Sequence, residues 1–230
     1  MNNKYNNFLT IILVLIIVAI LGIIGFLGYK YYQTYVIKNN SENFVDTFIG
    51  DTENNQNIDN NTNVTPPVIE DENMFEGVDE SEPNGGSSSN SNKKPQFNGF
   101  VTSGTIEIPA TNLKSPILAQ SEYSPKALET AVVETYGPGL NQVGNTTIFG
   151  HNYRNGTFFS NNKKLNVGDK IFITDSTGKR LTYIIYDKFE AKENYSDYMV
   201  RDTQGAIEIS LSTCTDNSKA RLIILAKANV

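Results

Sequence analysis

Residues 207–214 read Ile-Glu-Ile-Ser-Leu-Ser-Thr-Cys, and Arg221 follows after a connection of six residues. Successive side chains of a β-strand point to opposite faces, so the apolar residues of this stretch share one face with Thr213, while Cys214 belongs to the other. We expect the apolar face to pack inward, which leaves the Cys214 thiol solvent-accessible at the strand end. Arg221 begins the return strand of a hairpin and is therefore expected near that thiol. A neighbouring cation lowers a thiol pKa and can stabilise a developing oxyanion.

The chain has a single Cys and a single His among its 230 residues. This composition excludes an intramolecular disulfide framework, a Cys-based zinc cluster and a multi-histidine metal site. Any chemistry that joins a thiol to an imidazole must therefore use Cys214 and His151. His151 follows the predicted strand 146–150 and opens a polar, aromatic loop over residues 152–160. An imidazole there can accept the thiol proton and later protonate a leaving amine, and the protonation state belongs to the coupled pair.

The periodic part of the sequence lies in residues 99–230, which is long enough for one hydrophobic core. Short stretches rich in β-branched and apolar residues follow one another there, with turn residues between them. Besides 207–213, these stretches are 105–108, 115–119, 146–150, 170–174, 181–186 and 221–228. Residues 175–178 (Asp-Ser-Thr-Gly) are typical of a hairpin turn. The spacing predicts a mainly β protein, a closed or nearly closed barrel of about seven to eight strands with one or two short helices.

One segment of this domain has a helical pattern. Ser124 is a typical helix N-cap, and Pro125 suits the first helical position. Small and apolar residues then recur on one face, at Leu128, Ala131, Val132 and Thr135. The sequence therefore predicts a helix that begins at Pro125 and ends before Gly137.

An uncharged run of 22 residues, 8–29, lies near the start of the chain. At 1.5 Å per residue, a helix of this length spans a hydrocarbon core of about 30 Å. The run is longer than the apolar region of a signal peptide, and residues 29–32 (Tyr-Lys-Tyr-Tyr) do not resemble a small-residue cleavage site. We assign residues 1–38 to an uncleaved transmembrane anchor and its flanks, with tyrosines at the membrane interface. A cleaved signal peptide is the alternative.

Residues 39–98 are rich in Asn, Asp, Glu, Ser and Gly. Such a composition buries too little apolar surface to offset the conformational entropy lost on folding. We therefore assign this segment to an acidic, flexible spacer. The alternative for its first part is an extension of the juxtamembrane helix, because four apolar residues occur there, at Phe44, Val45, Phe48 and Ile49.

The charge is unevenly placed along the chain. Residues 1–40, 41–95 and 96–230 carry formal charges of +3, −10 and +1, which make up the net charge of −6. Because phosphate neutralisation needs clustered Lys and Arg, a folded part this close to neutral argues against a nucleic-acid partner. The acidic second segment favours an external C-terminus, since the positive charges on either side of the apolar run are nearly balanced.

Two motifs around the Cys and the His resemble those of the sortase family. Residues 210–214 (Ser-Leu-Ser-Thr-Cys), followed by Arg221, are similar to the family's TLxTC signature with an Arg on the next strand. Ser210 stands where the family commonly has Thr. Residues 148–152 (Ile-Phe-Gly-His-Asn) and 155–159 (Asn-Gly-Thr-Phe-Phe) resemble the sortase segment that carries the catalytic His.

Two further motifs extend the resemblance over residues 99–230. Residues 104–109 resemble the first strand of the sortase fold, and residues 166–171 resemble the Gly-Asp start of a later strand. The resemblance implies a sortase-like closed β-barrel behind a membrane anchor. The His segment is similar to that of class B sortases, but only about 20 residues separate Asp187 from Glu208, too few for the class B helical insertion. This favours a compact domain of class A, D or E type.

The resemblance implies a cysteine transpeptidase. Cys214 would attack the peptide bond after the Thr of an LPXTG-like sorting signal and form a thioacyl-enzyme. An amine of a cell-wall precursor or a pilin would then resolve that intermediate. His151 would be the general acid and base.

The resemblance also implies roles for the residues around this pair. Arg221 would hold the substrate or the oxyanion together with the backbone N–H of Thr215, and Thr213 would touch the substrate. Asn152 is expected either to orient His151 and contact substrate or simply to start its loop. No cofactor and no metal are expected.

The implied partners are surface proteins with a C-terminal sorting signal, the amine acceptor, and the plasma membrane through residues 8–29. The enzyme would be a single-pass membrane protein with an extracellular catalytic domain, in the thiol-protease class of hydrolases. Two other functions stay open: a membrane-tethered cysteine peptidase that only hydrolyses its substrate, and a non-catalytic surface module whose Cys and His are incidental.

Overall fold

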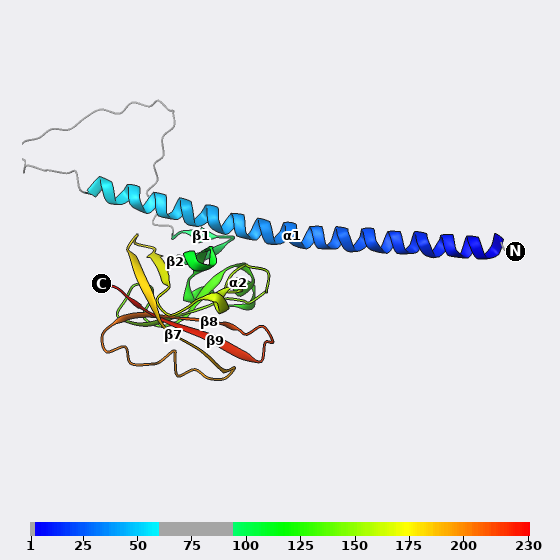
Figure 1. Cartoon of the computed structure of the whole chain (residues 1–230). Coiled ribbons are helices and arrows are strands. Elements are labelled where there is room, and N and C mark those ends of the chain that lie inside the picture. The colour runs from blue at the N-terminus through cyan, green and yellow to red at the C-terminus, as the bar shows by residue number, and fades with distance from the viewer. Residues whose placement is uncertain (1–2, 60–93) are drawn as a thin grey trace, which may run out of the picture.

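A computed structural model of the protein describes residues 3–59 and 94–230, with side chains of the first segment described for residues 8–52. The first segment is one long helix, and the second forms a β-barrel beside it (Figure 1). Residues 60–93 of the expected spacer lie outside the described residues.

Two α-helices and three 3-10 turns accompany nine strands in the part of the chain that the structure describes. The α-helices are α1 (Asn3–Asp59) and α2 (Pro125–Thr130), and the turns are Pro109–Thr111, Gln120–Glu122 and Asn162–Lys164. The strands are β1 (Gln96–Phe97), β2 (Phe100–Ile108), β3 (Leu113–Leu118), β4 (Val132–Tyr136), β5 (Gly144–Phe149), β6 (Lys170–Asp175), β7 (Arg180–Lys192), β8 (Ile207–Cys214) and β9 (Ala220–Ala228).

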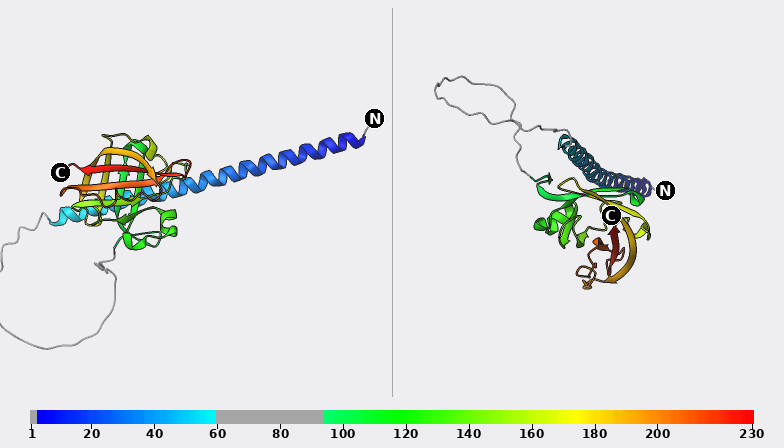
Figure 2. Two further views of the ribbon diagram at one scale, coloured as in Figure 1. Left: turned by 90° about the horizontal axis from the view of Figure 1, so that it is seen from below. Right: turned by 90° about the vertical axis from the view of Figure 1, so that its left-hand side faces the viewer.

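The strands form one sheet in the order β1-β2-β3-β4-β5-β8-β9-β7-β6, and an additional pairing of β2 with β6 closes it. Strands β2 to β9 therefore make the closed barrel that the sequence predicts. The pairs β3–β4 and β5–β8 are parallel, and the other pairs are antiparallel. The predicted turn at residues 175–178 joins β6 to β7, with the Gly178 N–H donating to the Asp175 carbonyl at 2.9 Å. Figure 2 shows the barrel from two further sides.

The inward faces of the strands fill the barrel with apolar side chains. Fully buried members include Ile106, Ile148, Ile173, Ile209 and Tyr183, which come from five different strands. The inward face of β8 carries the apolar residues, as the sequence predicts, because Ile209 and Leu211 belong to the core cluster. The core fixes the strand register, since a slip by one residue would turn the apolar side chains outward.

The helix predicted from Pro125 to Gly137 is wrong in its second half. Ser124 caps α2 as expected, and its hydroxyl accepts from the Ala127 N–H at 3.2 Å. The helix ends at Thr130, however, and residues 132–136 form β4, between β3 and β5. Val132 and Val133 are fully buried there. Pairing with a strand on each side and packing in the core therefore outweigh the helical spacing of these residues, which a short helix before them also accommodates.

The helix α1 also continues further than the predicted anchor. Residues 39–59, assigned above to the flexible spacer with a juxtamembrane helix as the alternative for their first part, are helical. Val45 is 0% and Phe48 6% exposed, and Phe44 packs on Phe97 of β1 with ring centroids 5.3 Å apart. Burying such a side chain stabilises by about 1.5–3 kcal/mol, which explains why this acidic segment is ordered against the barrel. The N-terminal part holds an apolar stretch with a mean hydropathy of 3.2, long enough to cross a membrane.

The strands that close the barrel lie close together at Gly104, where β2 pairs with both β3 and β6. A Cβ atom on Gly104 would lie 2.2 Å from the Thr174 carbonyl oxygen and 2.9 Å from the Asp175 Cα. Both are backbone atoms, so the closing pair of strands would have to separate.

We expect Gly104→Ala to lower the free energy of unfolding by about 1–3 kcal/mol, the usual cost of overpacking a core. Urea denaturation of the full chain in detergent measures this. Gly50→Ala is the matched control, because a Cβ there meets no atom within 4 Å and Ala favours a helix by about 1 kcal/mol. Equal urea midpoints for Gly104→Ala and the wild type would contradict the argument.

Candidate active site

The hairpin of β8 and β9 brings the only Cys and an Arg together. Cys214 is the last residue of β8 and pairs directly with Arg221 of β9. The Arg221 Nη1 donates to the Cys214 Sγ at 2.5 Å, and its Nη2 donates to the Glu193 carboxylate at 3.0 Å. The thiol is partly exposed. The expected neighbourhood of thiol and guanidinium is therefore present.

The connection between the two strands is a tight turn that uses its own backbone groups. The Thr215 N–H donates to the Ala220 carbonyl at 3.0 Å, and the Ser218 N–H donates to the Thr215 carbonyl at 2.8 Å. The Thr215 N–H, expected as an oxyanion donor, is thus already engaged in closing the hairpin. Arg221 is the donor that faces the sulfur.

His151 reaches the same end of the barrel through the parallel pairing of β5 with β8. This pairing runs to Phe149 opposite Ser212, and the Gly150 N–H still donates to the Ser212 carbonyl at 3.2 Å. Continuing that register places His151 level with Cys214. Within the part of the chain that the structure describes, the imidazole and the thiol share no hydrogen bond.

Asn152 ties the ends of the two strands together. Its Nδ2 donates to the Cys214 carbonyl at 2.9 Å and to the Asp216 carboxylate at 3.0 Å, and its Oδ1 accepts from the Arg154 N–H at 3.1 Å. The amide is therefore engaged inside the protein. The bond from Lys163 to Asp216 holds the pKa of that carboxyl below its ordinary value.

The imidazole of His151 lies in a partly buried aromatic setting. Its ring stacks on Tyr153 at 4.9 Å between centroids, and Tyr153 contacts Phe158 at 5.7 Å. Burial lowers the pKa of His151 below its ordinary value of 6.5; the negative charge of Glu129 on α2 opposes this shift and the positive charge of Arg221 reinforces it. The neutral imidazole, which can accept a proton, is the form that this setting favours.

The loop after His151 is held in a fixed shape. The Phe159 N–H donates to the His151 carbonyl at 3.1 Å, and Phe159 is fully buried. Gly150 is required at the start of the loop, because a Cβ there would lie 2.7 Å from the Phe159 ring and 2.9 Å from Val132. The aromatic pair Phe158 and Phe159 thus belongs to the core cluster.

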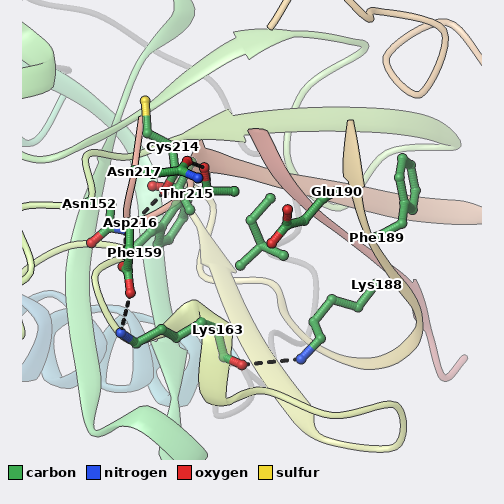
Figure 3. Close-up of a pocket in the computed structure, with 12 residues that line it drawn as sticks. Asn152, Phe159, Lys163, Lys188, Phe189, Glu190, Cys214, Thr215, Asp216 and Asn217 are labelled. Atoms are coloured by element: carbon green, nitrogen blue, oxygen red, sulfur yellow. Dashed lines mark hydrogen bonds and ion pairs between the residues drawn. The ribbon is translucent and has the colours of Figure 1, made fainter. Parts of the chain in front are cut away.

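A pocket of about 470 Å³ opens at this end of the barrel (Figure 3). Its lining includes Thr213, Cys214 and Thr215 from β8 and the turn, and Lys188 and Glu190 from β7. Figure 3 shows Cys214 at one end of the pocket, with its sulfur directed away from these two β7 side chains. His151 is not part of the lining.

The Thr213 hydroxyl is a feature of this pocket that the protein leaves unsatisfied. Thr213 is 4% exposed, and its Oγ1 has no hydrogen-bond partner in the structure. A buried hydroxyl without a partner costs free energy.

The outward face of β8 is not solvent-exposed, contrary to expectation. Glu208, Ser210 and Ser212 are buried, and Tyr198 and Arg201 contact them. Arg201 donates to the Ser210 Oγ at 2.6 Å and forms an ion pair with Glu208 at 2.7 Å. Sequence reasoning missed these contacts, because the alternation of residues 207–214 marks the polar face of the strand without showing what packs on it.

Among the residues that the structure describes, no group of three or more His, Cys, Asp and Glu could hold a metal ion. The candidate site combines one thiol, one imidazole and one guanidinium at the ends of adjacent strands. This set can carry out nucleophilic acyl transfer with a general base and an oxyanion donor.

Several solved structures have a similar fold. The structure of a sortase D5 transpeptidase from Clostridium perfringens is 26% identical, with a TM-score of 0.50, over 56% of this chain and 80% of that one. Sortase A from Corynebacterium diphtheriae (24% identical, TM-score 0.51; 57% of this chain, 62% of that one) and sortase C1 of GBS pilus island 1 (24%, 0.50; 55% and 64%) show the same fold.

The chain thus spans a little less than two thirds of the sortase A and sortase C1 structures. No curated protein sequence matches it. Residues 106–229, more than half of the chain, match the family described as the sortase domain. The chain therefore belongs to the sortase family of transpeptidases.

Proposed function

We propose that this sortase cleaves an LPXTG-like sorting signal after its Thr and transfers the upstream protein to an amine. The observation that carries the proposal is the 2.5 Å contact between the Arg221 guanidinium and the Cys214 sulfur. This contact lies at the end of β8, and His151 follows the neighbouring end of the parallel strand β5. A nucleophile, a proton carrier and a donor for the oxyanion are the three parts that acyl transfer needs.

In the first half-reaction the Cys214 Sγ bonds to the carbonyl carbon of the signal's Thr. The thiol proton passes to His151, and Arg221 stabilises the negative charge on the carbonyl oxygen. The peptide C–N bond then breaks, and His151 returns the proton to the leaving amine. The product is a thioester between Cys214 and the upstream protein.

In the second half-reaction an amine of a cell-wall precursor or a pilin attacks the thioester. His151 accepts the proton of that amine, the C–S bond breaks, and the proton restores the Cys214 thiol. The Thr213 hydroxyl, buried and without a partner beside the nucleophile, is proposed to bind the peptide. Thr215 shapes the pocket through its side chain, and Asn152 acts as a positioning residue that holds the two strand ends together.

The proposed site works at a membrane. We infer that residues 8–29 form a single-pass anchor in the plasma membrane and that the barrel lies outside the cell. Surface proteins with a C-terminal sorting signal are the proposed substrates, which would reach the enzyme in the same membrane. The main rival is a cysteine peptidase that only hydrolyses, since the same three side chains serve both reactions.

Replacing the thiol tests the nucleophile. We expect Cys214→Ala to abolish covalent capture of an LPXTG-type peptide, measured by intact-mass spectrometry of the full chain in detergent. Cys214→Ser is the isosteric control for folding. A variant without the thiol that still processes the peptide would rule out this chemistry.

Adding an amine separates transfer from hydrolysis. With a glycine or diaminopimelate amine present, we expect the wild type to yield the amide-linked product, measured by mass spectrometry. A peptidase would release only the free acid at every amine concentration.

Removing the guanidinium tests the oxyanion donor. We expect Arg221→Gln to lower kcat for the peptide by about 10²–10³-fold, the usual loss for one such donor. Lys219→Gln on the same turn is the matched control, because Lys219 is exposed, and its kcat should stay within about twofold of the wild type. A kcat for Arg221→Gln as high as that of the control would remove Arg221 from the mechanism.

The single His allows a direct titration by NMR, since one imidazole supplies all the signals. We expect a pKa below 6.5, because burial disfavours the charged form. Arg221→Gln should raise this pKa, and Glu129→Gln should lower it. If both variants keep the wild-type pKa of His151, neither charge acts on the imidazole.

The same shift links His151 to stability. The His151 imidazole binds a proton more tightly in the unfolded chain than in the folded chain, because its pKa is lower in the folded state. The stability contributed by the neutral imidazole is therefore fully present above about pH 6.5 and is lost as the pH falls through the folded pKa.

A further inference from the structure

The helix α1 carries two different surfaces in succession. Its N-terminal part, from Phe8 to Gln33, is exposed along its length, as a segment in contact with lipid must be. From Thr34 onward one side of the helix is covered by the barrel, and at Val45 and Phe48 it is buried. The membrane-crossing part and the docked part are therefore one continuous element.

The docked part is held by several kinds of contact. Phe44 packs edge-on against Phe97 of β1, and both Val45 and Phe48 are buried. The Asp46 carboxylate lies 2.5 Å from the Lys114 ammonium of β3 and, through that hydrogen bond, raises the pKa of Lys114. Apolar and charged contacts together fix the rotation of the helix about its axis relative to the barrel.

The contact nearest the membrane part involves the loop that follows His151. The Asn155 Nδ2 donates to the Thr34 Oγ1 at 3.4 Å. A small cavity beside this contact is lined by Ile37 and Ser41 of the helix and by Phe158 of the same loop. The loop thus meets the helix at the start of its docked part.

This contact sets the height of the site above the membrane. Thr34 follows the apolar run, which ends at Tyr29, by five residues, or about 7.5 Å along the helix axis. The headgroup layer on each side of a bilayer is about 5–8 Å thick. The loop after His151 therefore lies at the outer edge of the headgroups when the run spans the membrane.

The two views agree on the direction in which the site faces. In Figures 1 and 2 the turn between β8 and β9 points toward the side on which the N-terminal part of α1 extends, while the C-terminus lies at the opposite end of the barrel. Cys214 and Arg221 flank that turn. The end of the barrel with the site is therefore the end that faces the apolar part of α1.

No helix-breaking residue lies between the two parts of α1, since residues 29–49 contain neither Gly nor Pro. Side-chain contacts one turn apart support this segment, from Gln33 to Tyr29 at 2.7 Å and from Lys38 to Glu42 at 3.7 Å. A stiff connection transmits both distance and rotation.

We propose that α1 is a rigid arm that holds the catalytic end of the barrel at headgroup level, so that the length of this helix sets the distance from the bilayer at which the sortase cleaves a peptide. The substrate part of this inference rests on the proposed function, and the position of the arm does not.

A distance measurement tests the arm without any catalysis. Cys214 is the only thiol, so a donor dye attached there reports the height of the site by energy transfer to headgroup dyes in vesicles that contain the full chain. An Ala-rich helical insert of seven residues between Tyr32 and Gln33 adds about 10.5 Å and nearly two full turns. We expect the measured height to increase by about 10 Å.

A flexible Gly-Ser insert of the same length is the control for length alone. We expect it to broaden the distance distribution instead of shifting it. An unchanged distance with the helical insert, or the same distribution with both inserts, would overturn the rigid arm.

A matched pair of substitutions tests the docking. Val45→Glu places a charge in the buried face, and Thr47→Glu places the same charge on the exposed face. We expect Val45→Glu to broaden the distance distribution and Thr47→Glu to leave it as in the wild type. Equal distributions for the two variants would mean that the helix is not held by this face.

Substrates of graded length test the selectivity. Membrane-spanning peptides would carry an LPXTG site at increasing distances from the bilayer, and a soluble LPXTG peptide would serve as the reference. We expect the wild type to prefer the shortest spacers and the helical insert to shift the optimum outward by about three extended residues, with soluble-peptide turnover unchanged. If the optimal spacer length is the same with and without the helical insert, the selectivity is refuted. If the enzyme does not process even the soluble peptide, the proposed function is refuted, and the distance measurement alone then tests the arm.

Discussion

The parallel pairing of β5 with β8 is the constraint on which the site depends. Parallel strands end at the same edge of a sheet, so this pairing carries His151 and Cys214 to one end of the barrel. An antiparallel arrangement would place them at opposite ends. A parallel pair also needs a long connection, and the chain between these strands supplies β6 and β7, which close the barrel against β2 and β9.

The strand that carries the Cys is supported on both faces. Ile209 and Leu211 pack into the barrel, while Arg201 and Tyr198 bind the polar residues of the opposite face. A strand held in this way gives its last residue little freedom, which suits the proposed role of Cys214 as a nucleophile that meets its substrate in one geometry. The pairing of Cys214 with Arg221 then sets the position of the guanidinium, because hairpin partners lie directly opposite each other.

The long helix changes the expected role of the acidic segment. A flexible spacer would let the barrel move over a wide volume above the membrane, whereas a docked helix gives it one height and one orientation. The part of α1 that packs on the barrel is also the part next to the loop after His151. In the rigid-arm proposal, the membrane anchor and the barrel that carries the site therefore form one rigid body.

The sequence by itself determined the features that depend on near neighbours. The alternation in residues 207–214 and the short connection to Arg221 predict the hairpin and the meeting of thiol and guanidinium, because a hairpin leaves its residues few other partners. The uniqueness of Cys214 and His151 predicts that they act as a pair, and the turn at residues 175–178 follows from its residue types. Only the tertiary structure decided the outcomes that depend on distant contacts. Residues 132–136 are a strand because β3 and β5 flank them, and α1 continues past residue 38 because the barrel buries Val45 and Phe48. In each case the local pattern allowed two conformations, and burial against residues far away in the chain stabilised one of them.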